Sequence, residues 1–321
     1  MTDVQFNSII KYFDKINIKE TEPTTKHINK YIFDRDLSIV INELVILILN
    51  KINEGINGNN GKIIKKYVIN HISNNKIILQ EFYTYLLNNQ NNSNSIYLLG
   101  YFNYYGIGTD LDKQKAIELY KKASELENKV AQLNLTEIYI SMTNVESDRN
   151  LAFKLSKKLA EKECASGMNN LGLCYENGIG VDINELKAFE LYQKAADLEN
   201  SNGMNNLGWC YKFGIGTDID LQKSFELFKK SADLSNIYGI SSLADCYYNG
   251  VGTDINKQKS FELYLIAANL KNNYAQYFVA EMYETGNGIN KDMDQAIYWY
   301  KKSAKQGNQY AQDKLSELLE E

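Results

Sequence analysis

The side chains that most often carry out catalysis are sparse in this sequence. The two histidines, His27 and His71, stand apart from the cysteines and from any cluster of carboxylates. No H-E-x-x-H, G-x-S-x-G or C-x-x-C motif occurs, and the glycine-rich loop, H-R-D and D-F-G motifs that phosphoryl transfer requires are missing. We therefore expect a protein that is not an enzyme, with no catalytic residues, no metal site and no cofactor.

Paired glycines are the one motif that could bind a phosphate. They are Gly106 and Gly108, Gly178 and Gly180, Gly214 and Gly216, Gly250 and Gly252, and Gly286 and Gly288. A phosphate-binding loop follows a strand, opens a helix and usually carries Lys-Ser/Thr, and none of these pairs has that setting. Glycine accepts positive φ at a helix C-terminus, so we interpret the pairs as structural turns.

The cysteines are spaced for packing rather than for bonding. Cys174, Cys210 and Cys246 are each 36 residues apart, and Cys164 is the fourth. If each lies on an equivalent helix, neighbours are roughly 10 Å apart, whereas a disulfide needs Cα atoms within about 7 Å. We expect reduced, small helix-packing residues.

Charge and hydropathy exclude some partners. The net charge is −5 and the pI near 5.4, so no broad basic surface is available for nucleic acid or an anionic membrane. The most apolar run, residues 39–49, is shorter than the ~20 residues that span a bilayer. The first residues lack the pattern of a secretory signal, so we expect a cytoplasmic protein.

A period of 36 residues organises most of the chain, as "MNNLGLCYENGIGVD" and "MNNLGWCYKFGIGTD" show. Each period holds a stripe of small, apolar, small and aromatic residues at helical spacing, then the glycine turn. A second helix follows, and the residues expected to cap it are Asp112, Asp148, Asn184, Asp220, Asn256 and Asp292. A helix pair cannot bury its apolar face alone, so the pairs must stack.

The pattern L-G-x-x-Y-x-x-G-x-G, then K-A and Y-x-K-A-A, resembles the Sel-one-like repeat, a relative of the tetratricopeptide repeat. The resemblance implies an all-α, right-handed α-solenoid of about six 36-residue repeats within residues 94–321. The repeats are expected at 94–128, 129–164, 165–200, 201–236, 237–272 and 273–308, with a C-terminal capping helix at 309–321. In the second repeat Met142 and Asn144 replace the glycines, which predicts a preserved helix pair with a differently shaped or more mobile turn.

Residues 1–93 lack the 36-residue period, but their sequence pattern predicts a helical N-terminal segment. We expect helices from Asp36 or Ser38 to Gly55, over Lys62–His71 and over Asn75–Leu87. The segment resembles the one that joins a protein kinase domain to Sel-one-like repeats in some eukaryotic proteins. We expect it to cover the open edge of the first repeat, with docking of a partner as the alternative.

By analogy with tetratricopeptide repeats, the first helix of each pair lines a concave groove. Three rows of side chains should then face it: first Tyr97, Leu133, Asn169, Asn205, Ser241 and Tyr277; second Leu98, Asn134, Asn170, Asn206, Ser242 and Phe278; third Tyr101, Glu137, Leu173, Trp209, Asp245 and Glu281. None of the three groove rows contains Lys or Arg. We expect binding by Asn169, Asn170, Asn205, Asn206, Trp209, Tyr97, Tyr101 and Tyr277.

Asparagine amides both donate and accept hydrogen bonds, so a row of them can hold the backbone of an extended peptide, with Trp209 as an aromatic anchor. The alternative is that coding bias and recent duplication produced the asparagines. The function expected is a non-catalytic scaffold or adaptor in signalling that binds a protein or peptide, not nucleic acid or membrane. The second hypothesis is a regulatory or targeting module that acts with a separate protein kinase.

Overall fold

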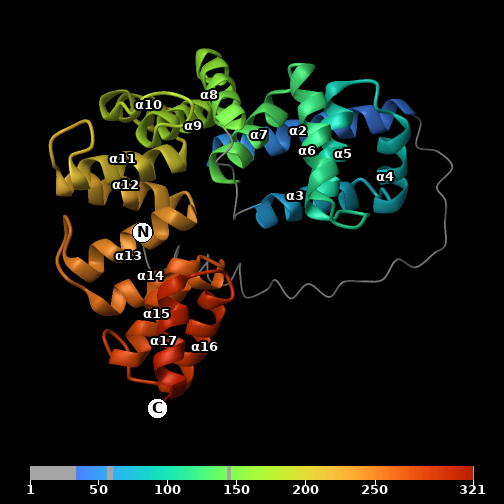
Figure 1. Ribbon diagram of the computed structural model, residues 1–321. Helices are drawn as coiled ribbons and strands as arrows, with labels where there is room; N and C mark the ends of the chain where they lie inside the picture. Colours follow the sequence, from blue (N-terminus) through green and yellow to red (C-terminus); the bar gives the residue numbers. More distant parts are fainter. Residues whose placement is uncertain (1–33, 56–60, 143–145, 321) are drawn as a thin grey trace. The chain divides into compact units, whose positions relative to one another are not determined.

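The computed structural model describes residues 34–55, 61–142 and 146–320, and these form sixteen helices, α2 to α17, and no β-strand (Figure 1). The chain divides into two units after Ile39, and the packing described below lies within the second, Val40–Glu321. His27 and the turn residue Asn144 lie outside the described residues, as do residues 56–60.

Six helix pairs follow one another along the chain, so the α-solenoid that the period predicted is confirmed. The first helices of the pairs, the A helices, are α5 (Ser93–Tyr105), α7 (Lys129–Met142), α9 (Ala165–Asn177), α11 (Ser201–Phe213), α13 (Ile237–Asn249) and α15 (Asn273–Thr285). The second, the B helices, are α6 (Lys113–Glu125), α8 (Glu146–Glu161), α10 (Glu185–Asp197), α12 (Leu221–Asp233), α14 (Lys257–Asn269) and α16 (Met293–Ala304). The last pair is followed by α17 (Gln309–Glu320), at the place expected for a capping helix. The second repeat keeps its pair, α7 and α8.

The A helices end at the first glycine of each pair. These C-caps lie in the left-handed region, with φ of 74° at Gly214, for example. The second glycine of the pair also has positive φ and lies against the start of the preceding B helix. A Cβ atom built on Gly216 would be 2.3 Å from the carbonyl oxygen of Glu185, so a larger residue would push the two repeats apart.

The B helices begin on capping side chains, with one exception. The carboxylate or amide oxygen of Asp112, Asn184, Asp220, Asn256 and Asp292 accepts a hydrogen bond from the backbone N–H three residues on. The prediction is wrong for Asp148, because α8 begins at Glu146 and so takes Asp148 into its first turn. The 36-residue period predicts that this helix starts at Arg149. The B helix of the repeat that lacks the glycine pair is therefore longer than the other B helices.

Asparagine also starts the A helices, a column that the sequence pattern did not reveal to us. The N-cap side chains that accept a backbone N–H are Asn92, Asn128, Asn200, Asn236 and Asn272, and Asn308 does the same at the start of α17. In the third repeat Cys164 stands at the equivalent position and makes no such bond. Each N-cap leaves its amide nitrogen free to donate elsewhere.

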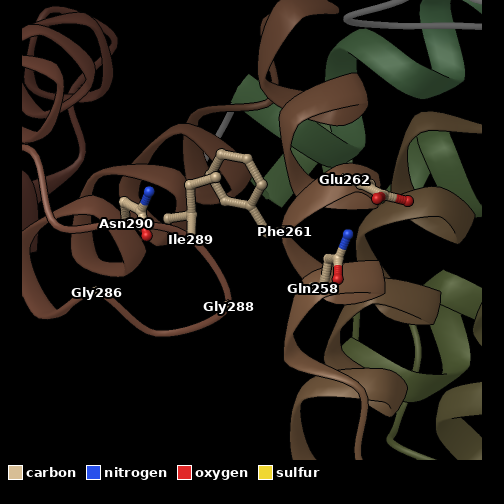
Figure 2. Close-up of a pocket in the computed structure, with 7 residues that line it drawn as sticks. All are labelled: Gln258, Phe261, Glu262, Gly286, Gly288, Ile289 and Asn290. Carbon is tan, nitrogen blue, oxygen red and sulfur yellow. The ribbon is translucent and has the colours of Figure 1, made fainter.

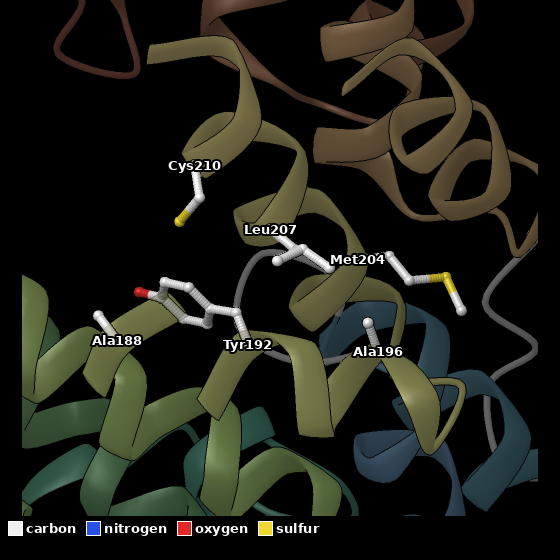
Figure 3. Packing of buried hydrophobic residues seen from close by; sticks show 6 residues of the cluster. All are labelled: Ala188, Tyr192, Ala196, Met204, Leu207 and Cys210. Carbon is white, nitrogen blue, oxygen red and sulfur yellow. The ribbon is translucent and has the colours of Figure 1, made fainter. Parts of the chain in front are cut away.

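The core lies between successive helices of the array. In one cluster Ala188, Tyr192 and Ala196 of α10 pack against Met204, Leu207 and Cys210 of α11 (Figure 3). Burying a large apolar side chain contributes about 1.5–3 kcal/mol. Small residues make room for it: a Cβ atom on Gly172 would lie 2.6 Å from the Tyr192 ring. Cys164 and the three periodic cysteines are buried free thiols, as expected.

In the third to sixth repeats, the tyrosine column of the A helices packs against the repeat before it. Four tyrosine rings meet a phenylalanine of the preceding B helix nearly edge to face, with centroids 5.2–5.7 Å apart and interplanar angles of 86–89°. The pairs are Phe153–Tyr175, Phe189–Tyr211, Phe225–Tyr247 and Phe261–Tyr283. This geometry suits aromatic quadrupoles and contributes about 0.5–1.5 kcal/mol per pair beyond area burial.

The first N-terminal helix, α2 (Asp34–Asn53), is seated along the N-termini of the A helices. Its buried apolar face consists of Val40, Ile41, Leu44, Val45, Ile48 and Ile52. The hydrogen bonds at its C-terminal end run from Ser166 Oγ to Ile52 O (2.6 Å), Asn200 Nδ2 to Asn53 O (2.8 Å), Ser201 Oγ to Glu54 O (2.6 Å) and Asn202 Nδ2 to Gly55 O (2.9 Å). The last carbonyls of a helix lack internal partners and carry partial negative charge, so helix N-termini are well suited to bind them.

The other N-terminal helices, α3 (Gly61–Asn74) and α4 (Leu79–Asn88), contact the first repeat. Lys65 of α3 donates to the carbonyl of Tyr105 (2.8 Å), and Tyr83 of α4 donates to Asn103 (3.3 Å). A Cβ atom on Gly108 would lie 3.1 Å from the carbonyl of Leu79, so α4 meets the first glycine turn as each B helix meets the next. Because the chain turns at Lys76, which has positive φ, α4 starts four residues later than predicted from Asn75.

Candidate functional site

The asparagines of the first two groove rows bond to one another across repeats. Asn206 Nδ2 donates to Asn169 Oδ1 (2.9 Å). Ser242 Oγ donates to Asn205 Oδ1 (3.0 Å) in the next junction. Asn169, Asn170 and Asn205 are buried, and Asn206 is half-buried. The structure therefore uses the amides of Asn169, Asn205 and Asn206 within the array, and Asn206 keeps the most exposed surface among the four asparagines.

Two of the tyrosines expected in the groove lie in the interior. Tyr97 stacks on Tyr120 with centroids 5.4 Å apart, and its hydroxyl accepts a hydrogen bond from Asn134 Nδ2 (3.2 Å). Tyr101 packs against Tyr105 at 4.6 Å, and its buried hydroxyl has no hydrogen-bond partner in the described part of the chain. Burial raises the pKa of both phenols well above the ordinary value. Both residues contribute to the packing of the first repeat.

Trp209 is half-exposed on α11 and has an aromatic neighbour that sequence reasoning missed. Phe213 stacks on it, with ring centroids 5.5 Å apart and an interplanar angle of 9°, and is itself 59% exposed. The Lys212 amine lies 4.5 Å from the Trp209 ring centroid. The spacing of four residues on one helix could have indicated the pair.

The third groove row carries three carboxyl groups whose burial raises their pKa. The pKa of Glu137 rises to about 7, and those of Asp245 and Glu281 rise as well. Asp245 accepts hydrogen bonds from the hydroxyls of Tyr264 (2.5 Å) and Tyr274 (3.2 Å). The groove rows hold no Lys or Arg that could pair with these groups.

Tyr277, the last expected binding residue, is half-buried in an aromatic group at the C-terminal end of the array. Its ring lies 5.3 Å from Phe278, 5.7 Å from Tyr300 and 6.1 Å from Tyr310. Burial raises the pKa of the Tyr277 phenol. The group presents aromatic surface away from Trp209, near α15 and α17.

A surface hollow of about 570 Å³ lies between the start of α14 and the next glycine turn (Figure 2). It is lined by Gln258, Phe261, Glu262, Gly286, Gly288, Ile289 and Asn290. One carboxylate and two amides line it without a nucleophile or a second titratable group. The arrangement offers no acid–base pair.

Within the ranges that the structure describes, no group of His, Cys, Asp and Glu could hold a metal ion. His71 lies at the surface, where its Nε2 is 2.9 Å from Glu43 Oε2 of α2. Of the described helices, none is both long enough and apolar enough to cross a bilayer.

The sequence matches the family model of the Sel1 repeat over residues 93–128, 141–164, 165–200, 201–236, 238–272 and 273–308, more than half of the chain. No curated protein matches it. Similar solved structures include a protective antigen of uropathogenic Escherichia coli strains that displays an SLR fold. That protein is 27% identical over 76% of this chain, with a TM-score of 0.53.

A Sel1 repeat protein from Oxalobacter formigenes is 25% identical over 81% of this chain and 88% of its own, with a TM-score of 0.47. An immunity protein from Pseudomonas aeruginosa is 21% identical over 57% of this chain and 67% of its own, with a TM-score of 0.44. The chain spans 52% of the length of the Escherichia coli protein. On the six matched repeats, the chain belongs to the Sel1 repeat family.

Proposed function

We propose that this chain is a non-catalytic scaffold that binds a polypeptide in the concave groove formed by the A helices. Sel1 repeat arrays are generally protein-interaction scaffolds. We propose that in this chain the concave groove is the surface that binds the partner. The observation that carries it is the Trp209–Phe213 pair. Two stacked aromatic rings that keep exposed surface beside a cation are the kind of residues that dominate interface energetics.

The groove chemistry favours a segment with one large apolar side chain and a nearby Lys or Arg. The apolar group would pack on Trp209 and Phe213, and the positive charge would pair with Glu281. Asp245 is buried and already accepts hydrogen bonds from Tyr264 and Tyr274, so it does not take part. Asn206 and Tyr277 offer the remaining polar and aromatic contacts. Asn169, Asn170, Asn205, Tyr97 and Tyr101 act in this proposal through the shape of the groove floor, because they are buried.

The proposal places the protein in the cytoplasm as an adaptor in signalling. Four buried thiols without a disulfide are consistent with a reducing compartment. A separate protein kinase remains the partner suggested by the N-terminal segment. It would be identified by the same experiment as any other partner.

The test compares partners captured from native lysate by the wild type and by the double variant Trp209→Ala, Phe213→Ala, with identification by mass spectrometry. The matched control is Tyr298→Ala, which removes a 48% exposed ring with Lys302 Nζ 4.3 Å from its centroid on a B helix. All proteins are first shown to be helical by circular dichroism. A partner lost from the double variant and kept by the control supports groove binding. Recovery of the same partners by all three forms would refute it.

A further inference from the structure

The turns that join the A helices to the B helices carry exposed aliphatic side chains. Ile183 is 65% exposed, and Ile219 and Ile255 are each 63% exposed. Each lies three residues after the second glycine of its pair and one residue before the N-cap of the B helix, so all three hold the same place in repeats three, four and five. A single exposed isoleucine is ordinary, but the same exposure at one place in three successive repeats indicates a shared role.

Two leucines at the starts of the B helices lie between these isoleucines. Leu186 of α10 is 58% exposed, and Leu221 of α12 is 43% exposed. A Cβ atom on Gly216 would lie 3.0 Å from Leu186 Cα, and Gly252 packs against the Leu221 carbonyl in the same way. Each turn therefore lies on the start of the preceding B helix, and the side chains form one row. We call this row the aliphatic edge; it consists of Ile183, Leu186, Ile219, Leu221 and Ile255.

The aliphatic edge has polar ends. By the 36-residue period, the positions equivalent to Ile183 are Ser147 in the second repeat and Lys291 in the sixth, and both are exposed. At roughly 100 Å² for a fully exposed aliphatic side chain, the edge exposes roughly 300 Å² of apolar surface. The largest apolar patch of a typical soluble protein has this size, and such patches mark interaction sites. With its polar surroundings the edge has the size and layout of the centre of a standard interface, which covers about 800 Å² on each partner.

A second copy of this chain matches the aliphatic edge in spacing. The exposed side chains of both copies recur at the same interval from repeat to repeat, so two edges laid against each other stay in register across all three repeats. Another protein would have to match this interval independently. In a two-fold contact the same patch faces itself, so an axis through the middle repeat brings Ile219 opposite Ile219 of the second copy.

Charge beside the aliphatic edge is balanced, as a contact between identical surfaces requires. An exposed aspartate precedes each isoleucine, and an exposed lysine follows four residues later and lies over a tyrosine ring of the same repeat. The pairs are Asp182 and Lys187, Asp218 and Lys223, and Asp254 and Lys259. A row with one sign of charge would repel a second copy, whereas both signs in every repeat let the carboxylates of one copy meet the ammonium groups of the other.

We propose that the aliphatic edge is the interface of a two-fold symmetric dimer of this chain. Two copies pack edge to edge through repeats three to five, with Ile219 at the symmetry axis. The interface lies at the C-terminal ends of the A helices. It is separate from the edge that holds the end of α2, which the N-termini of the A helices form.

The test is sedimentation velocity of the full chain over about 1–100 µM, the range in which an interface of modest affinity dissociates. The triple variant Ile183→Ser, Ile219→Ser, Ile255→Ser introduces the residue that the second repeat has at the equivalent position. The matched control is Leu126→Ser, Leu198→Ser, Leu234→Ser. These leucines are 44–53% exposed and also occur once per repeat, at the C-caps of B helices, where each stands between two polar residues. Circular dichroism and thermal unfolding check that both variants are folded.

We expect the wild type and the control to pass from monomer to dimer within this range. The triple variant should stay monomeric, with a dissociation constant raised at least about tenfold. A second measurement uses single cysteines, since the four native thiols are buried. Ile219→Cys should form a disulfide-linked dimer with copper phenanthroline as the oxidant, and Leu234→Cys should not.

A wild type that is monomeric at every concentration would overturn the proposal. So would a triple variant that associates like the wild type, or a control that loses association. A dimer that forms without cross-linking at position 219 would place the contact elsewhere and would also overturn it.

Discussion

The contact between the end of α2 and the A helices requires a glycine at position 55. Replacing Gly55 by alanine tests how strongly these contacts hold the helix. Gly55 has a φ of +90°, and a Cβ atom there would lie 2.3 Å from Ser201 Oγ and 2.8 Å from Asn202 N. The left-handed backbone alone costs a non-glycine residue about 1 kcal/mol. Because a backbone nitrogen cannot move aside, the end of α2 must withdraw and lose its bonds to Ser201 and Asn202.

These bonds are Ser201 Oγ and Ser201 N to Glu54 O, and Asn202 Nδ2 to Gly55 O. At about 1 kcal/mol each, their loss adds about 3 kcal/mol to the backbone strain. The lost hydrogen bonds alone correspond to an increase of about two orders of magnitude in the equilibrium constant for local opening of α2. The assay is hydrogen–deuterium exchange with mass spectrometry over residues 40–53, with a peptide from α14 as the internal reference.

Gly307→Ala is the matched control, because Gly307 has a φ of +86° and no atom within 4 Å of its Cβ position. It carries the same backbone strain without the collision. We expect it to lower the unfolding free energy by about 1 kcal/mol and to leave exchange in α2 unchanged. If Gly55→Ala exchanges in α2 as slowly as Gly307→Ala, then α2 is not held by these contacts.

Three further changes have defined outcomes. Tyr192→Phe removes the 2.5 Å hydrogen bond to Glu176 and should lower the unfolding free energy by about 1 kcal/mol in urea titration; no change would mean the bond is not formed. Burial raises the pKa of Glu137 to about 7, so the stability of the wild type should fall between about pH 4.5 and 7, because the folded state holds its proton longer. The expected fall in unfolding free energy is about 2 kcal/mol, because the Glu137 side chain keeps some solvent contact. Glu137→Gln should remove this pH dependence, and an unchanged pH profile would show that Glu137 does not cause it. Asn236→Ala loses a cap and the three hydrogen bonds of its amide nitrogen, so it should destabilise by about 1–2 kcal/mol more than Asn272→Ala, which loses a cap alone. Equal melting curves would show that the amide bonds contribute nothing.

The repeat architecture was predictable because its signal is carried by residue types that recur at one period. The A-helix N-caps recur in the same way, and the same alignment could have found them. From α7 to α15, the residue before each A-helix N-cap has positive φ, and the sequence did not predict this. The residues there are Glu127, Glu163, Glu199, Ser235 and Lys271, which do not favour that conformation. Only Gly307 shows the expected residue at that position. The left-handed turn is imposed there by packing of the flanking helices rather than by local preference.

The place of α2 was not predictable for a different reason. The bonds that hold its C-terminal end join residues more than a hundred positions apart, and their acceptors are backbone carbonyls, which every residue has. The amphipathic pattern predicts the helix, and Gly55 predicts where it ends. Neither feature indicates which surface the helix covers.

The duplicated asparagines have an explanation that the sequence did not suggest. A first-row side chain accepts from a second-row side chain of the next repeat in three junctions, and the pairs are Tyr97–Asn134, Asn169–Asn206 and Asn205–Ser242. The residue types differ while the bond and its separation of 37 residues persist. Coding bias would produce asparagine without this pairing. A ligand-binding row would require the amides to stay free, and Asn169 and Asn205 are buried. Buried polar groups must find partners, so the hydrogen bond between repeats is the property that these positions share.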